Sequence, residues 1–444
     1  MAGEAVELTP VRGRARIDVL DILRGLAILG IYFMNVPFQG ASVNLAFDNP
    51  RFLGWTPLDA ANWYWVQVLL EGTQRCLLEF LFGAGMMVLT AKAMEPDGPV
   101  AVADLYYRRT LWLAAFGLFD IFVWLWTGDI LFAYAVAALP LFPFRKLGPK
   151  ALVALGMACA LWTAGWGIAQ YVERATLIDT VHAAQAHKAA GQPITDQDKK
   201  ALDEWKKLVD RKKATAPDPE TLKNLAEEKA AHAGGWFGYA SFYWAMWMKF
   251  FWSGGLLLTV IFEAFSAMLI GVALWKWGII QGKRSARFYA GLATVAYAFG
   301  IGSRIAGTDQ WLSGSLDPNP YWVTIEFARL AIGLGHVALI NLIVTSGIGA
   351  KILSPFKAAG RIAFSLYFLE QLIGIHILFS PYGFNLWGKF GWAGLNAVAL
   401  AMLVALLIAA NIWTRYFATG PMEWAWRSLA YLKRQPFRKR RLAP

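Results

Sequence analysis

The residues whose types and spacing point most directly to chemistry lie in the first apolar stretch of the chain, residues 18–37. Asp21 and Arg24 stand three residues apart within it, which places an acid and a base on one face of a helix. A charged side chain in hydrocarbon costs at least about 2.5 kcal/mol, so the pair indicates a polar interior rather than a lipid-facing surface. We therefore expect Asp21 and Arg24 at one end of a functional cavity.

A second set of candidates is expected near the opposite membrane face. Asp120 lies near the end of the apolar stretch 107–127, and Asp129 begins the next stretch. Two neighbouring carboxylates can share a proton, bind a cation or act as a general base. Asp129 is also well placed to cap the N-terminus of a helix, and the sequence leaves both roles open for it.

His336 lies near the middle of the apolar stretch 321–346, beside Gly333 and Gly335. Small neighbours let a second helix approach, so we expect this histidine either to bond across a helix interface or to transfer protons. Several further ionisable residues occur in apolar stretches and indicate a hydrated central cavity. They are Glu71, Arg75, Glu79, Glu263, Glu326, Arg329, Arg361, Glu370 and His376, of which Glu71, Arg75 and Glu79 have the i,i+4 spacing of a ladder on one helix.

Composition decides which elements position these residues. Hydrophobic residues make up 57% of the 444 residues and charged residues only 16%, which excludes an ordinary soluble enzyme. Continuous apolar runs of about twenty residues are long enough to cross a bilayer as helices. We predict an all-α, polytopic integral membrane protein with about ten transmembrane helices. The predicted spans are residues 18–37, 63–91, 107–127, 129–144, 150–171, 254–276, 286–306, 321–346, 359–379 and 393–416.

Basic residues predict the orientation of these spans. Every second connection is rich in Lys and Arg, from residues 12–16 before the first span to residues 433–441 at the end of the chain. The positive-inside rule then places both termini in the cytoplasm. The same distribution explains the net charge of +12, so we expect no nucleic-acid partner. No cleavable signal peptide is evident, and residues 18–37 are expected to remain as the first span.

The predicted domains are a five-span half at residues 1–171, a charged insertion at 172–235 and a second five-span half at 236–444. The insertion carries eleven basic and eleven acidic residues and is expected to form extracytoplasmic helices. Residues 236–253 are aromatic and typical of an interfacial helix. No internal repeat is apparent, which disfavours an inverted-repeat transporter. The chain has no phosphate-binding loop, nucleophile elbow or metal-ligand spacing, so no metal site is predicted.

Several stretches together resemble the YeiB-like family, a bacterial membrane family labelled as a domain of unknown function (DUF418). The resemblance extends over nearly the whole chain, with residues 172–235 the least typical part. The matching stretches are Leu20–Ile31 (LDILRGLAILGI), Phe80–Gly85 (FLFGAG), Phe116–Phe122 (FGLFDIF), Trp126–Leu131 (WTGDIL), Gly360–Tyr367 (GRIAFSLY) and Gly420–Arg427 (GPMEWAWR).

That family is similar to the transmembrane acyltransferase superfamily, whose members transfer an acyl group from acyl-CoA to an acceptor. The resemblance implies that the protein is located in the bacterial cytoplasmic (inner) membrane, where membrane lipids surround it. It also implies that two copies form a homodimer. By motif, Asn35 resembles an Asn at the outer end of the superfamily's first span. Asn49 stands where a loop histidine is expected, and Asp120 stands where YeiB-like sequences usually have a histidine. An amide cannot act as a general base, whereas a carboxylate can.

Three hypotheses follow from the sequence. The first is an acyltransferase-like protein that uses acyl-CoA or acetyl-CoA, with Asp120, Asp129, His336 and Asn35 as catalytic residues. Asp21, Arg24 and Arg361 would organise the donor site at the cytoplasmic end. The second is a proton- or ion-coupled transporter in which the same ionisable residues relay protons or bind an ion. The third is a non-catalytic relative that binds a lipid or another ligand.

Overall fold

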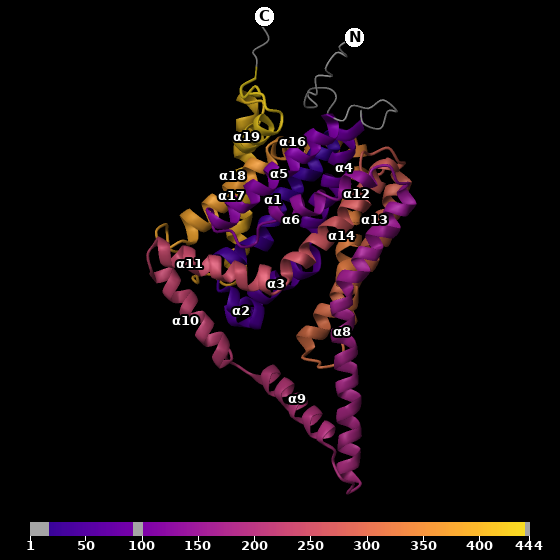
Figure 1. Ribbon diagram of the computed structural model, residues 1–444, viewed down its shortest axis with the longest axis vertical. Helices are drawn as coiled ribbons and strands as arrows, with labels where there is room; N and C mark the ends of the chain where they lie inside the picture. Colours follow the sequence, from indigo (N-terminus) through magenta and orange to yellow (C-terminus); the bar gives the residue numbers. More distant parts are fainter. Residues whose placement is uncertain (1–16, 92–100, 440–444) are drawn as a thin grey trace, which may run out of the picture.

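The computed structural model describes residues 17–91 and 101–439, and within these ranges it contains helices and a single isolated β-bridge but no strand (Figure 1). The elements before the insertion are α1 (Asp18–Gly40), α2 (Val43–Asp48), η2 (Pro50–Leu53), α3 (Pro57–Leu69), α4 (Thr73–Thr90), α5 (Ala101–Phe122), α6 (Leu131–Ala138), α7 (Leu141–Phe144) and α8 (Pro149–Ala189). They are followed by α9 (Asp196–Lys213), α10 (Pro219–Ala233), α11 (Trp236–Trp247), η4 (Met248–Ser253), α12 (Leu256–Lys276), α13 (Ala286–Ser313) and α14 (Pro320–Thr345). The last are α15 (Gly347–Ile352), α16 (Ser354–Arg361), α17 (Ala363–Gln371), η5 (Leu372–Phe379), α18 (Trp392–Tyr416) and α19 (Pro421–Ala430).

The all-helical prediction is confirmed, and five described helices are long and apolar enough to cross a membrane. These are α1, α8, α12, α14 and α18, and a sixth candidate is formed if α16 and residues 363–379 count as one span despite a 76° bend. The count of ten spans and their orientation stay predictions. The basic residues at positions 12, 14, 16 and 92 that support the orientation lie outside the described residues.

The predicted span over residues 63–91 is interrupted. Helix α3 ends at Leu69 and α4 begins at Thr73, with Gly72 between them in a left-handed conformation (φ 65°) that favours glycine. A Cβ at Gly72 would also lie 3.0 Å from the Cδ atom of Arg329, so the break makes room for that side chain. The expected single-helix ladder of Glu71, Arg75 and Glu79 is therefore wrong, because Glu71 precedes the helix that carries the other two.

Two other predicted spans also depart from straight helices. Residues 129–144 form only the short helices α6 and α7, separated at Pro140, which cannot supply the backbone N–H of a continuous helix. In the opposite sense, α8 continues for 41 residues from the predicted fifth span far into the insertion. No break in the helix marks the predicted domain boundary at residue 171.

The insertion forms a long triangle that projects from one end of the bundle (Figure 1). The lower part of α8 leads away, and α9 and α10 return towards α2 and α11. Side-chain contacts hold α9 and α10 against the segment that contains α2. Arg211 pairs with Asp48 at 2.9 Å, and Glu228 accepts hydrogen bonds from the Ser42 hydroxyl and the Val43 backbone.

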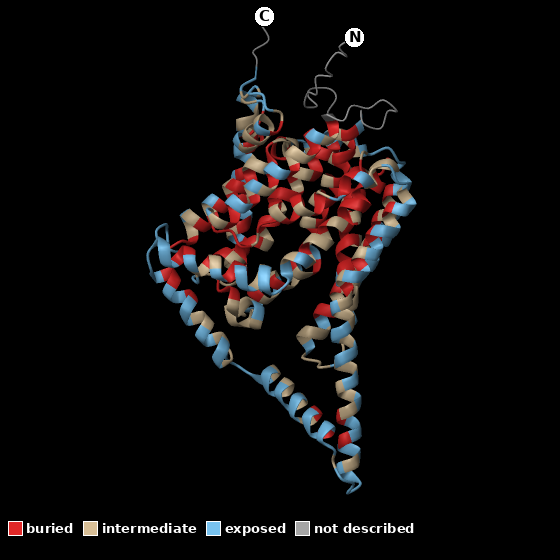
Figure 2. Ribbon diagram, in the orientation of Figure 1, coloured by how far each residue is buried: buried red, intermediate tan, exposed pale blue. Residues whose placement is uncertain are grey.

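Buried residues gather at the centre of the bundle (Figure 2), and many large apolar side chains are exposed on its exterior. The clearest example is α18, which leaves Leu400, Val404, Ile408 and Ile412 exposed at successive i,i+4 positions. Scattered exposed apolar residues are ordinary on a soluble protein, but a continuous stripe along a 25-residue helix is typical of contact with lipid. We call the end of the bundle where α1 begins and α19 lies the proximal end, and the end where α1 finishes and α10 lies the distal end.

Candidate functional site

Two cavities lie one beyond the other between the proximal and distal ends. The proximal cavity has a volume of about 280 Å³ and is formed by α1, α4, α5, α6, α17 and α19 together with the α16–α17 bend. Most of its wall is apolar. Its wall also contains one carboxylate, Glu423, and four arginines that come from four different parts of the chain: Arg24, Arg109, Arg361 and Arg427. A cavity that combines an apolar wall with several guanidinium groups is suited to an anion attached to an apolar group.

Asp21 holds two of these arginines at the cavity wall. Its carboxylate is buried behind the cavity, where it pairs with Arg24 at 3.0 Å and with Arg361 at 3.8 Å. A Cβ at Gly360 would clash with the backbone oxygen of Asp21, so α16 packs directly against α1. The predicted grouping of Asp21, Arg24 and Arg361 is thus found in the structure, although Asp21 supports the arginines and does not line the cavity itself.

Helix α19 forms part of the wall of the proximal cavity and positions Arg109. The Arg109 guanidinium lies 4.2 Å from the ring centroid of Trp426, whose indole N–H donates to the Arg109 carbonyl. Glu423 of α19 caps the start of α17, accepting from the backbone N–H of Phe364 at 2.7 Å and from the Ser365 hydroxyl at 2.5 Å. These contacts make α19 a fixed wall of the cavity.

The distal cavity has a volume of about 330 Å³ and lies between α1, α4, the loop before α6 and the segment η4–α12. Asn35 and Asp129, both predicted as catalytic residues, line it together with Glu71, Gln74 and Arg75. The Asp129 carboxylate caps α6, accepting from the backbone N–H of residues 131 and 132 at 3.1 and 2.7 Å. The capping role is therefore present, and it coexists with a position on the cavity wall.

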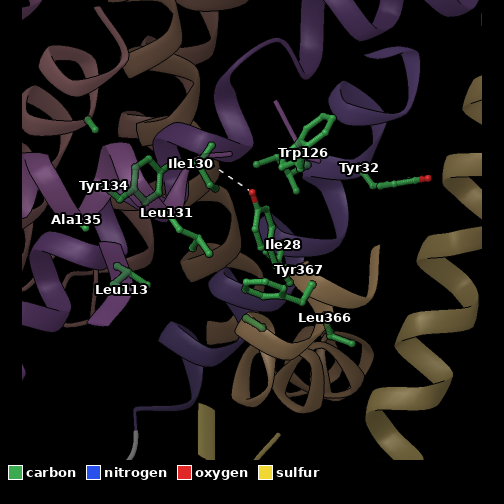
Figure 3. Close-up of a cluster of buried hydrophobic side chains, with 14 of the residues drawn as sticks. Ile28, Tyr32, Leu113, Trp126, Ile130, Leu131, Tyr134, Ala135, Leu366 and Tyr367 are labelled. Carbon is green, nitrogen blue, oxygen red and sulfur yellow. Dashed lines mark hydrogen bonds between the residues drawn. The ribbon is translucent and has the colours of Figure 1, made fainter. Parts of the chain in front are cut away.

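A thin layer of side chains separates the two cavities. Ile130 lines both of them, and its backbone N–H lies 3.4 Å from the Tyr367 hydroxyl, as the dashed line in Figure 3 marks. Tyr367 lines the proximal cavity, and its hydroxyl donates to Asp129 of the distal cavity at 3.2 Å. Polar contact thus crosses the partition at one point.

Asp120 lies behind this point, on α5. It is fully buried beside Asp129 and Tyr367, and neither of its carboxylate oxygens accepts a hydrogen bond from another described residue. The predicted pair of carboxylates is therefore brought together by the fold. Of the two, Asp129 lines a cavity, whereas Asp120 is enclosed by protein.

His336 and Asn49 lie apart from the two cavities. The His336 ring bonds to the Tyr297 hydroxyl of α13 at 2.8 Å, which is the bond across a helix interface that the sequence left open. Gly335 beside it allows this approach, because a Cβ there would lie 2.6 Å from the Tyr297 ring. The Asn49 side chain caps η2 by accepting from the Arg51 backbone at 3.1 Å. In this structure each side chain has a local structural partner.

A charged network joins α4, α12 and α14 next to the distal cavity. Arg329 donates to Glu326 through two nitrogens, at 2.7 and 2.8 Å, and to Glu79 at 2.6 Å. Arg75 pairs with Glu263 at 2.5 Å and with Glu79 at 3.7 Å. The pairs of Arg329 with Glu326 and of Arg75 with Glu79 lie within one helix, α14 and α4 respectively. Arg329 with Glu79 and Arg75 with Glu263 connect different helices, so the buried charges are compensated both along the helices and across the bundle.

The cavity residues that the sequence reasoning missed include Arg109, Arg427 and Tyr367. Arg109 lies near the start of the predicted span 107–127, and nothing in its local sequence indicates a cavity. Arg427 and Tyr367 occur within the motifs that resemble the YeiB-like family, so the motifs contained a signal for both. Their grouping depends on the packing of α5, α17 and α19, which no local pattern specifies.

Comparisons with known proteins relate the chain to proteins of unknown function. Residues 274–433 match the family model described as "Protein of unknown function (DUF418)". The uncharacterized protein YxaH of Bacillus subtilis (strain 168) is 27% identical over 98% of this chain and 98% of its own length. These matches support a relationship of the chain to the YeiB-like DUF418 family. The uncharacterized protein YeiB of Escherichia coli (strain K12) is 25% identical over 92% of this chain and 95% of its own. No solved structure matches the chain.

Since these relatives cover nearly the whole chain, the family similarity extends to the first half, which contributes Arg24, Asn35, Arg109 and Asp129 to the two cavities. The names of the relatives assign no activity. The function of this chain must therefore be inferred from the cavities themselves.

Proposed function

We propose that this protein is a membrane-embedded acyltransferase of the bacterial inner membrane that transfers an acyl group from acyl-CoA to an acceptor at the distal side. The observation that carries the proposal is the pair of cavities separated by Ile130 and Tyr367. One cavity is suited to an anion with an apolar group, and the other presents a carboxylate and a free amide. On the predicted ten-span topology the proximal cavity opens towards the cytoplasm, where acyl-CoA is found.

The proximal arginines would bind the phosphates of the donor. Four guanidiniums face one lining carboxylate, Glu423, and the nearby carboxylate of Asp21, so the cavity keeps an excess of positive charge. Arginine binds phosphate through two parallel hydrogen bonds, which fixes the orientation of the ligand. The apolar wall between Ile28 and Leu113 would accept the chain of the donor as it extends towards the partition.

The distal residues would act on the acceptor. Asp129 would take the proton of an acceptor hydroxyl or amine as its oxygen or nitrogen bonds to the acyl carbon. The carbon–sulfur bond breaks at the same carbon, and the proton passes to the sulfur that leaves. Asn35 would donate an amide N–H to the carbonyl oxygen as negative charge develops on it. Asp120 would act only through Asp129, because it is enclosed by protein.

Binding of radiolabelled acetyl-CoA to the purified protein tests the donor site. Replacing Arg109 or Arg361 with Gln removes charge-assisted hydrogen bonds worth about 1.5–3 kcal/mol each, so affinity should fall by roughly tenfold or more. Arg287→Gln is the matched control, because Arg287 is exposed on α13. The absence of saturable binding, or equal binding by all three variants, would overturn the donor assignment.

A second candidate is proton- or ion-coupled transport, and one observation favours it. Glu370 on α17 is fully buried, and neither carboxylate oxygen has a hydrogen-bond partner among the described residues. A buried carboxylate of this kind is typical of proton pathways in membrane proteins. Proton uptake into proteoliposomes that is abolished by Glu370→Gln, without acetyl-CoA binding, would favour transport over acyl transfer.

A further inference from the structure

The distal cavity combines hydrogen-bonding groups that have no protein partner with an aromatic wall. Asn35, Gln74 and Thr127 line it from α1, α4 and the loop before α6. None of these three side chains makes a hydrogen bond to another described group, although Asn35 and Thr127 are only 9% and 7% exposed. Buried amides and hydroxyls are ordinarily satisfied, so three uncommitted groups facing one cavity indicate a polar ligand.

The charges of the cavity disfavour an anionic ligand. Asp129 accepts hydrogen bonds from two backbone N–H groups and from Tyr367, and Arg75 is paired with Glu263 and Glu79. Glu71 is the remaining lining carboxylate. A cavity with two carboxylates and one committed arginine does not attract an anion. Amide and hydroxyl groups bind ligand hydroxyls, which both donate and accept.

The opposite wall of the cavity is apolar and reaches the surface. Phe38, Phe47, Phe250 and Phe251 line it together with Leu256. Phe47 and Leu256 are 62% and 38% exposed, so they mark where the cavity meets the outside. Phe47 and Phe250 approach each other across the opening, with ring centroids 6.0 Å apart.

The surface around this opening is suited to lipid. Met248, Trp252 and Leu258 are exposed beside it on η4 and α12. The preceding helix α11 lies across the bundle in Figure 1 and exposes Trp236 and Phe237. Aromatic and apolar residues on a helix that runs across the spans are typical of the interface between headgroups and acyl chains.

We infer that the distal cavity binds a membrane lipid with an uncharged, hydroxyl-bearing headgroup, which enters laterally between α2 and the η4–α12 segment. The headgroup hydroxyls contact Asn35, Gln74 and Thr127, and the acyl chains remain at the phenylalanine wall and in the bilayer. Only the further statement that this lipid accepts the acyl group rests on the proposed function. Binding of the lipid itself requires neither acyl-CoA nor transfer.

Photocrosslinking in nanodiscs without acyl-CoA tests the inference. The probe is monoglucosyl diacylglycerol with a diazirine in one acyl chain, and the reference is phosphatidylcholine with the same chain. We expect the glucosyl lipid to label residues 248–260 at least fivefold more than phosphatidylcholine does. Asn35→Leu combined with Gln74→Leu should reduce this labelling at least fivefold, whereas Gln197→Leu on the exposed face of α9 should leave it unchanged.

Three results would overturn the inference. The first is equal labelling by both lipids, which would indicate an unspecific lipid contact. The second is competition by soluble methyl glucoside as strong as that by the glucosyl lipid, which would remove the need for a membrane anchor. The third is unchanged labelling in the double variant while its thermal unfolding matches that of the unmodified protein. Loss of acetyl-CoA binding would refute the donor site and leave this result standing.

Discussion

Arg329 provides the sharpest test of how the buried charges hold the bundle together. Its guanidinium bonds to Glu326 through two nitrogens, to Glu79 through a third contact and to the Glu263 backbone carbonyl at 3.3 Å. It thereby connects α14 with α4 and α12. Arg329→Met keeps most of the side-chain volume and leaves two buried carboxylates without their main cation.

Removing one member of a buried ion pair costs about 3–5 kcal/mol, because the remaining charge stays in a poorly solvated position. Glu79 and Glu326 are 0% and 3% exposed, so solvent cannot compensate them. We expect a loss of that size in the free energy of unfolding, measured by equilibrium unfolding in mixed micelles. The exposed Arg287→Met should change it by less than about 0.5 kcal/mol.

A compensated variant separates charge from packing. Combining Arg329→Met with Glu79→Gln and Glu326→Gln removes the uncompensated charges, and we expect it to recover more than half of the lost stability. If the triple variant is as unstable as the single one, the loss comes from packing and not from the uncompensated carboxylates. If Arg329→Met costs less than about 1 kcal/mol, the network does not stabilise the bundle in the way argued above.

Three further outcomes follow from residues outside the spans. Burial lowers the pKa of His232, whose ring stacks on Trp387, to about 4. The stability that the neutral ring contributes above pH 6.5 is therefore lost as the pH falls towards 4. Over this range the hydrogen exchange of α10 should rise in the unmodified protein but not in His232→Phe. The Thr56 hydroxyl lowers the pKa of Asp59, whose carboxylate also accepts from the Ala393 backbone. Asp59→Ala should therefore lower the free energy of unfolding by about 1–2 kcal/mol at pH 7. This difference should shrink as the pH falls below 3.8, as chemical unfolding at pH 7 and below pH 3.8 would measure. A protease site inserted after residue 200 should be cleaved from the outside of intact cells, and cleavage only from the inside would contradict the predicted orientation.

The sequence was a sound guide to helices and to the polar residues they carry. Apolar length placed α1, α12, α14 and α18 within a few residues of their observed bounds. It failed where a tertiary contact interrupts a helix. The break at Gly72 is occupied by Arg329, a residue more than 250 positions away, and the apolar pattern of residues 63–91 carries no sign of it.

The sequence by itself predicted the all-helical structure and the long apolar helices, because apolar runs of this length in a membrane satisfy their backbone hydrogen bonds as helices. It also singled out Asp21, Arg24, Asn35 and Asp129. Only the tertiary structure decided that these residues divide between two cavities, and that Arg109, Arg427 and Tyr367 join them. Residue types report which chemistry is available, whereas the grouping of side chains from α1, α5, α17 and α19 arises from helix packing over hundreds of residues.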